Sequence, residues 1–119
     1  MTPERAKSIN GLDETVLDQL IALGVLRKAC QLYLENSRSL IDEGRAAVQN
    51  GHLDEVARVF HTLTSSSAMV GAIELSKLCK RMETIARDGK INECREFLIE
   101  LLDSHQRAIT NLRSYLNKS

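Results

Sequence analysis

The stretch LDEVARVFHTLTSSSAMV, residues 53–70, decides the fold. Its apolar and small residues recur at three- and four-residue steps, which is the period of an amphipathic α-helix with one buried face. Asn50-Gly51 precedes the stretch and Gly71 follows it, and both residue types are common at helix ends. We therefore predict a helix over residues 53–70 with a buried stripe made of Leu53, Val56, Phe60, Leu63, Ser67 and Val70.

The same period continues on both sides of this helix. The one proline, Pro3, lies outside every periodic segment, and no segment alternates for long enough to predict a sheet. Four long amphipathic helices with short connections pack most simply as an antiparallel four-helix bundle, which a short first helix would cap. We expect an all-α fold with a flexible N-terminal tail over residues 1–11 and one helical domain over residues 12–119. The other expected helices run from Asp13 to Gly24, over Val25–Gln49, over Ala72–Arg87 and from Asn92 onwards.

The composition fits a single globular domain and excludes several classes of function. The 119 residues are 43% hydrophobic, and 16 basic side chains balance 16 acidic ones. A neutral chain with two Phe, two Tyr and no Trp offers neither the charge nor the stacking surfaces that nucleic acids require. No apolar run approaches the roughly 20 residues of a membrane span, and the first ten residues lack a secretory hydrophobic core. We expect a cytoplasmic protein.

The three cysteines, Cys30, Cys79 and Cys94, are odd in number and widely spaced. This spacing favours reduced thiols in a helical core over a disulfide framework or a zinc site. We expect no metal and no other cofactor in the chain itself.

His61 is the candidate for chemistry. A helix turns about 100° per residue, so this side chain projects about 130° away from the middle of the buried stripe, towards solvent. Its neighbours on the same face are the small residues Ala57, Ser65 and Ala68. An accessible imidazole with an ordinary pKa near 6.5 is largely neutral and nucleophilic at cellular pH, which suits a transferable phosphoryl group.

A solvated surface histidine without any function is the competing interpretation of His61. The other two histidines illustrate it. His52 falls in the turn before the helix, and His105 falls on or beside the inner stripe of the last helix, where we expect a packed, hydrogen-bonded side chain.

The segment HTLTSSSAMVGAIEL, residues 61–75, resembles the signature of the histidine phosphotransfer (HPt) domains of multistep phosphorelays. Leu78-Cys79, Met82-Glu83 and the run from Ala86 to Gly89 resemble the segment that follows it in that family. The resemblance extends over about residues 12–116. It implies a four-helix bundle with the active histidine, His61, exposed in the middle of a helix. It also implies phosphoryl exchange with aspartates of receiver domains, whose own sites hold the magnesium, and with a hybrid sensor histidine kinase. We expect a monomer.

Two positions differ from the family pattern. Lysine is usual three residues after the histidine and glycine four residues after it, whereas this chain has Thr64 and Ser65. Thr64 cannot supply the charge of the lysine, but Ser65 is still small. Arg58, one turn before His61, is a candidate replacement because guanidinium pairs well with phosphate oxygens. A solvated arginine without such a role is the alternative. The predicted docking surface for receivers is Ala57, Arg58, Thr64, Ser65 and Ala68.

Two other functions compete with phosphotransfer. The first is a binding module that docks on a receiver or another signalling protein without passing phosphate, which the two departures from the family pattern favour. The second is an enzyme, which we do not expect. The chain has no Gly-rich phosphate loop, no zinc-ligand spacing and no nucleophile with an obvious base. The serines of residues 64–67 lie within a predicted helix, not on the tight turn that a nucleophile elbow requires.

Overall fold

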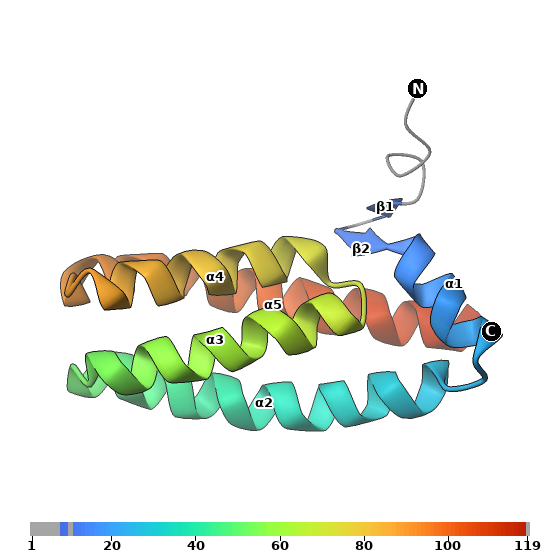
Figure 1. The fold of residues 1–119 in the computed structure, drawn as a ribbon, viewed down its shortest axis with the longest axis horizontal. Coiled ribbons are helices and arrows are strands. Elements are labelled where there is room, and N and C mark those ends of the chain that lie inside the picture. The colour runs from blue at the N-terminus through green and yellow to red at the C-terminus, as the bar shows by residue number, and fades with distance from the viewer. Residues whose placement is uncertain (1–7, 10, 119) are drawn as a thin grey trace.

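The computed structural model describes residues 8–9 and 11–118 and contains, within them, five helices and one pair of very short strands (Figure 1). The strands are β1 (Ser8–Ile9) and β2 (Leu12–Asp13). The helices are α1 (Glu14–Ala22), α2 (Leu26–Asn50), α3 (Leu53–Met69), α4 (Ile73–Arg87) and α5 (Ile91–Lys118). The predicted all-α class and the predicted order of helices are confirmed, with boundaries that differ by one or two residues.

Helices α2 to α5 run alternately up and down, and each packs against its two neighbours in the bundle (Figure 1). α3 contacts α2 on one side and α4 on the other, while α5 lies behind and contacts both α2 and α4. α1 crosses one end of the bundle, as expected for a capping helix (Figure 1). No helix in the described part of the chain is long and apolar enough to cross a membrane.

The core is the meeting point of the predicted stripes. Val56, Phe60, Leu63 and Ser67 of α3 are fully buried, as are Cys30, Cys79 and Cys94, whose thiols are free. Burial of each large apolar side chain contributes about 1.5–3 kcal/mol, so these stripes are the main source of stability.

Two buried polar pairs cross the core. The hydroxyls of Tyr33 on α2 and Ser67 on α3 are 2.7 Å apart, and burial raises the pKa of Tyr33 to about 12. The hydroxyl of Ser37 lies 3.2 Å from Nε2 of His105, which is buried and hydrogen-bonded as predicted. Each pair satisfies polar groups that would otherwise be costly to bury.

The N-terminal segment is attached to the turn between α3 and α4. The backbone N–H of Asp13 donates to the carbonyl of Gly71, and the N–H of Ile73 donates to the carbonyl of Gly11. Gly71 has a φ of 78°, and a Cβ there would come within 2.9 Å of the carbonyl oxygen of Asp13, so only glycine fits this contact. Strand β1 therefore lies within the segment before residue 12 that the sequence predicted to be a flexible tail, and the flexibility of that tail stays a prediction. The remainder of the predicted flexible tail, residues 1–7 and 10, lies outside the described residues.

Helices α2 and α3 approach each other unusually closely at Gly44 of α2. A methyl group at Gly44 of α2 would come within 2.7 Å of ring carbon Cε2 of Phe60 and 3.1 Å of a methyl of Val59. Gly44 therefore allows the fully buried ring of Phe60 to pack against the backbone of α2.

We predict that Gly44→Ala lowers the free energy of unfolding by about 1 kcal/mol. Overpacking a core costs about 1–3 kcal/mol, and the higher helix propensity of alanine returns about 1 kcal/mol of that. Denaturant titration measures the change. In a Phe60→Leu background, which lacks the clashing ring atoms, the same alanine should be neutral or stabilising. An equal loss in both backgrounds would show that the ring is not the obstacle.

Candidate functional site

His61 stands in the middle of α3 with 65% of its side chain exposed. The ring of the preceding residue, Phe60, is fully buried, and because consecutive side chains of a helix project about 100° apart, His61 points away from that part of the core. The sequence predicted that the side chain of His61 is exposed, and the structure confirms that exposure.

A carboxylate from α4 contacts the imidazole. Oxygens Oε2 and Oε1 of Glu83 lie 3.1 Å and 3.3 Å from Nδ1 of His61, and only 4% of the Glu83 side chain is exposed. An ionised carboxylate can only accept a hydrogen bond, so Nδ1 carries the proton in this contact. In the neutral ring the free lone pair then lies on Nε2, which is the nucleophilic nitrogen.

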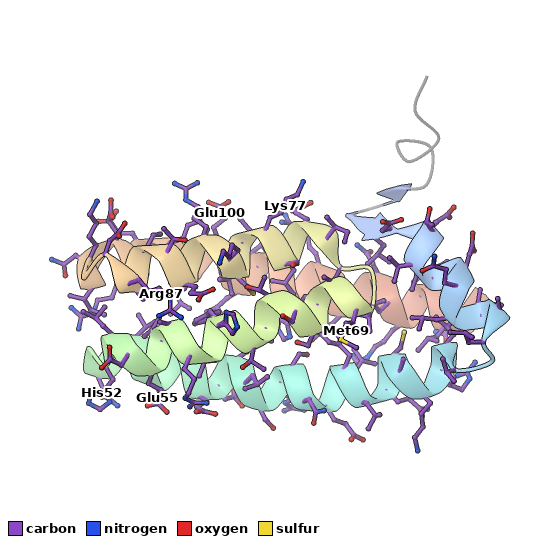
Figure 2. The ribbon with its side chains drawn as sticks, in the orientation of Figure 1. His52, Glu55, Met69, Lys77, Arg87 and Glu100 are labelled. Atoms are coloured by element: carbon purple, nitrogen blue, oxygen red, sulfur yellow. The ribbon has the colours of Figure 1, made fainter. Side chains whose placement is uncertain are left out.

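Two cations of α4 hold Glu83 in its ionised form. Nε and Nη2 of Arg87 donate to Oε2 at 2.9 Å and 2.7 Å, and Nζ of Lys80 lies 3.5 Å from Oε1. Burial raises the pKa of Glu83. The hydrogen bonds from Arg87 and His61 and the charge of Lys80 outweigh burial, and they hold that pKa below its usual value. Figure 2 shows Arg87 on the side of α4 that faces α3.

A surface hollow lies beside the imidazole. His61 and Arg58 line it from α3 and Arg87 from α4, together with the small residues Ala57 and Ala86. Both alanines are buried, and their small side chains form part of the wall of the hollow. The arrangement combines an exposed imidazole with two guanidinium groups at the surface, and it can hold an anionic group near Nε2.

The predicted docking residues are not all at the surface. Ser65 and Arg58 are exposed, and Thr64 and Ala68 are half-buried. Ala57 is only 4% exposed, so the prediction that it is a surface neighbour of His61 is wrong. The side of α3 that carries Ala57 faces α4, whose Ala86 lines the same hollow, and a large residue at Ala57 would disturb the core.

Thr64 and Arg58 have partners within the protein. The hydroxyl of Thr64 donates to the carbonyl of Phe60 at 2.7 Å, and the carbonyl of Thr64 accepts the hydroxyl of Ser76 on α4 at 2.7 Å. Arg58 forms ion pairs with Glu43 of α2 and, at 3.1 Å, with Glu55 of α3. Arg58 is thus ion-paired with carboxylates on the α2 side of His61, whereas Arg87 is ion-paired with Glu83 on the α4 side.

Sequence reasoning missed Glu83, Arg87 and Lys80 as site residues. A signal was present, because Glu83 follows Cys79 and Met82 on the apolar stripe of α4, where a carboxylate is rarely buried without partners. His52 is exposed and lies at the N-cap position immediately before α3, in agreement with its predicted place in the turn before that helix. Within residues 8–9 and 11–118, no group of three or more His, Cys, Asp or Glu side chains could hold a metal ion.

Comparison with known proteins identifies the family of this chain and a solved structure with a similar fold. A model of the Hpt domain matches residues 28–114, well over half of the chain. Histidine-containing phosphotransfer protein B (HptB) from Pseudomonas aeruginosa PAO1 has a similar crystal structure, with a TM-score of 0.86 and 19% identity over 94% of this chain and 99% of that chain. At that identity the likeness concerns the fold, and a comparison with curated proteins finds no match. The family match extends across α3 and α4, which carry His61 and Glu83, and the chain therefore belongs to the Hpt domain family, whose members are phosphocarriers of phosphorelays and not enzymes.

Proposed function

We propose that His61 accepts a phosphoryl group from the aspartate of one receiver domain and passes it to the aspartate of another. The observation that carries this proposal is the exposed imidazole whose Nδ1 is hydrogen-bonded to Glu83, which leaves the lone pair on Nε2. Hpt domains generally partner with receiver domains. In a two-component relay, the first receiver would belong to a hybrid sensor histidine kinase and the second to a response regulator.

The transfer needs little from this chain beyond position and charge. Nε2 attacks the phosphorus of the donor's phosphoaspartate, an N–P bond forms, and the P–O bond to the aspartate breaks with its electrons returning to that carboxylate. Magnesium in the partner's site would neutralise charge on the phosphoryl oxygens during both transfers. The exposed imidazole of this chain enters that site from outside.

The phosphoryl group brings up to about two negative charges to the surface of α3. Thr64 supplies no charge to balance them. Arg87 is the better placed cation, because it and His61 hydrogen-bond the same carboxylate, and its guanidinium lines the hollow beside the imidazole. Arg58 lines the hollow too, but two carboxylates, Glu43 and Glu55, already engage it.

The receiver would dock on the exposed face of α3 around His61. Ser65 and Ala68, one and two turns further along the helix, present small side chains there. Met69, at the end of α3 (Figure 2), is 72% exposed and offers an apolar contact of the kind that is enriched at protein interfaces. Arg58 and Thr64 lie beside this face and complete the proposed surface.

A binding module without phosphotransfer is the second candidate. The uncharged Thr64 in the family's lysine position favours it. The contact between His61 and Glu83 argues against it, since a docking surface alone does not need an oriented imidazole.

We predict that His61→Gln abolishes phosphate uptake and leaves the fold intact, because the side chain is mostly exposed. The assay incubates the protein with a phosphorylated receiver and measures acid-labile, base-stable phosphate on it. His52→Gln, which removes another exposed histidine, is the matched control and should be labelled like the wild type. Undiminished labelling of His61→Gln would contradict the assignment, and absent labelling of the wild type with intact receiver binding would support the binding module.

We predict that Ser65→Gln weakens receiver binding about tenfold, because a longer side chain would stand between α3 and the partner. The change should alter stability by less than about 0.5 kcal/mol, as is usual for exposed positions. Ser114→Gln, at an exposed serine of α5, is the control. Equal affinities of both variants, measured by calorimetry, would place the receiver elsewhere.

We predict that Arg87→Ala shortens the phosphohistidine lifetime or slows transfer a few-fold, and that Arg58→Ala has the smaller effect. Exposed ion pairs are worth only about 0–1 kcal/mol, so neither change should abolish transfer. Thr64→Lys should offset the loss in Arg87→Ala by restoring a cation on α3. A larger effect of Arg58→Ala would reverse the assignment of the two arginines.

A further inference from the structure

The connection from α1 to α2, residues 21–25 (the apolar turn), carries an unusual set of side chains for a protein surface. Ile21, Leu23 and Val25 are all exposed, and Leu23 is 74% exposed. These three large apolar side chains lie within five consecutive positions. Single exposed apolar side chains are common, whereas a group of them marks a surface that binds something.

The apolar turn lies at one end of the bundle, where α1 crosses it and α5 finishes (Figure 1). Gly24, in the middle of the turn, has a φ of 73°. A Cβ placed on Gly24 would meet no atom within 4 Å beyond its two chain neighbours. No other segment in the described part of the chain therefore covers the turn at this point, and the turn projects into solvent.

Three cations, Arg27, Lys28 and Arg113 (the basic cluster), stand beside the apolar turn. Arg27 and Lys28 follow the turn directly at the start of α2, and Arg113 is near the end of α5. Nη2 of Arg27 donates to the carbonyl of Leu116 at 3.3 Å, which places Arg27 about one helical turn from Arg113. All three cations are exposed, and none forms an ion pair with a carboxylate of residues 8–9 and 11–118.

Other arginines of the bundle do have carboxylate partners. Arg58 pairs with two glutamates and Arg87 with one. The nearest carboxylates on α1 face elsewhere. Burial raises the pKa of Tyr115 on α5, and the charges of Asp18 and Glu14 raise it further, so both carboxylates lie near that hydroxyl. The charge of the basic cluster thus remains available to a partner from outside.

We propose that the apolar turn and the basic cluster dock this protein on the surface of a membrane that contains anionic lipids. The apolar side chains enter the boundary between headgroups and acyl chains, and the cations pair with the lipid phosphates. This inference is independent of the proposed function of His61, because it concerns another surface and needs no phosphoryl group.

The combination of the two features favours lipid as the partner. Segments that lie in the membrane interface join exposed apolar side chains to adjacent Lys and Arg, and anionic lipids attract those cations to the headgroups. The projection of the turn points the same way. A fluid bilayer accommodates a projecting apolar group without a preformed pocket, whereas a protein partner needs a cavity of matching shape. Since no described helix is long and apolar enough to cross a membrane, the contact is peripheral.

Docking through the apolar turn leaves the phosphotransfer site open. The hollow beside His61 is lined by Leu53 and Asp54 at the start of α3 and by Arg87 and Gly89 at the end of α4. These ends of α3 and α4 lie at the opposite end of the bundle from the apolar turn (Figure 1). A receiver therefore reaches His61 while the turn rests on a membrane.

The test measures binding of the full chain to lipid vesicles by sedimentation at low salt. The vesicles contain equal parts of phosphatidylglycerol and phosphatidylcholine, or phosphatidylcholine alone. Leu23→Gln removes an apolar contact, and its matched control is Ile99→Gln, because Ile99 is 75% exposed on α5. Lys28→Gln removes one charge, and its control is Arg45→Gln, because Arg45 is exposed near the far end of α2.

We expect the wild type to bind the mixed vesicles and to bind neutral vesicles about tenfold more weakly. Leu23→Gln should weaken binding to the mixed vesicles about tenfold and Lys28→Gln about fivefold, in line with the loss of one apolar side chain or one charge at a membrane surface. Both controls should bind like the wild type. High salt should weaken the binding, because it screens the charges of the lipids and the basic cluster.

Absence of binding of the wild type to the mixed vesicles would overturn the inference, and this result stands even if a variant does not fold. Equal binding by Leu23→Gln and Ile99→Gln, in variants with the wild-type circular dichroism spectrum, would overturn it as well. Two further results would assign the turn to a protein partner instead. Self-association of the wild type that Leu23→Gln abolishes would identify a second copy of this chain as the occupant. Slower phosphate uptake by Leu23→Gln from a phosphorylated receiver would place the turn in the receiver interface.

Discussion

The burial of one face of α3 is the constraint on which the rest of the structure depends. α3 lies between α2 and α4, and both neighbours fix its rotation. On one side the ring of Phe60 packs over Gly44, and on the other the hydroxyl of Ser76 donates to the carbonyl of Thr64. A helix held at two sides cannot turn about its axis. His61 is therefore kept at the surface and within reach of Glu83.

The periodicity of the sequence was sufficient to predict the bundle, because each helix repeats its apolar residues over several turns. It also predicted the exposure of His61, which depends only on the angle between that residue and the buried stripe of its own helix. Contacts between helices were not predictable in this way. Ala57 is buried and Glu83 reaches His61 because α4 approaches one side of α3, and the pattern of one helix does not reveal which side its neighbour takes.

The paired strands β1 and β2 were also missed, for a different reason. Each has two residues, which is too short for any alternation of apolar and polar side chains to be recognised. Their position depends on backbone hydrogen bonds to the turn at Gly71, and backbone groups leave no trace in the side-chain sequence. From the sequence, Gly71 was predicted only to end a helix. In the structure it also leaves space for the N-terminal segment at Asp13.

The buried His105 makes the stability of the bundle sensitive to acid. Burial lowers the pKa of His105, and the charge of Asp42 only partly opposes this, so the folded bundle disfavours a charged ring there. The unfolded chain has no such preference and binds that proton below its ordinary pKa of 6.5. Acidification below that value therefore favours unfolding, and the free energy of unfolding falls as the pH falls. Acid cleaves the N–P bond of a phosphohistidine. It thus also destabilises the helical bundle that carries His61.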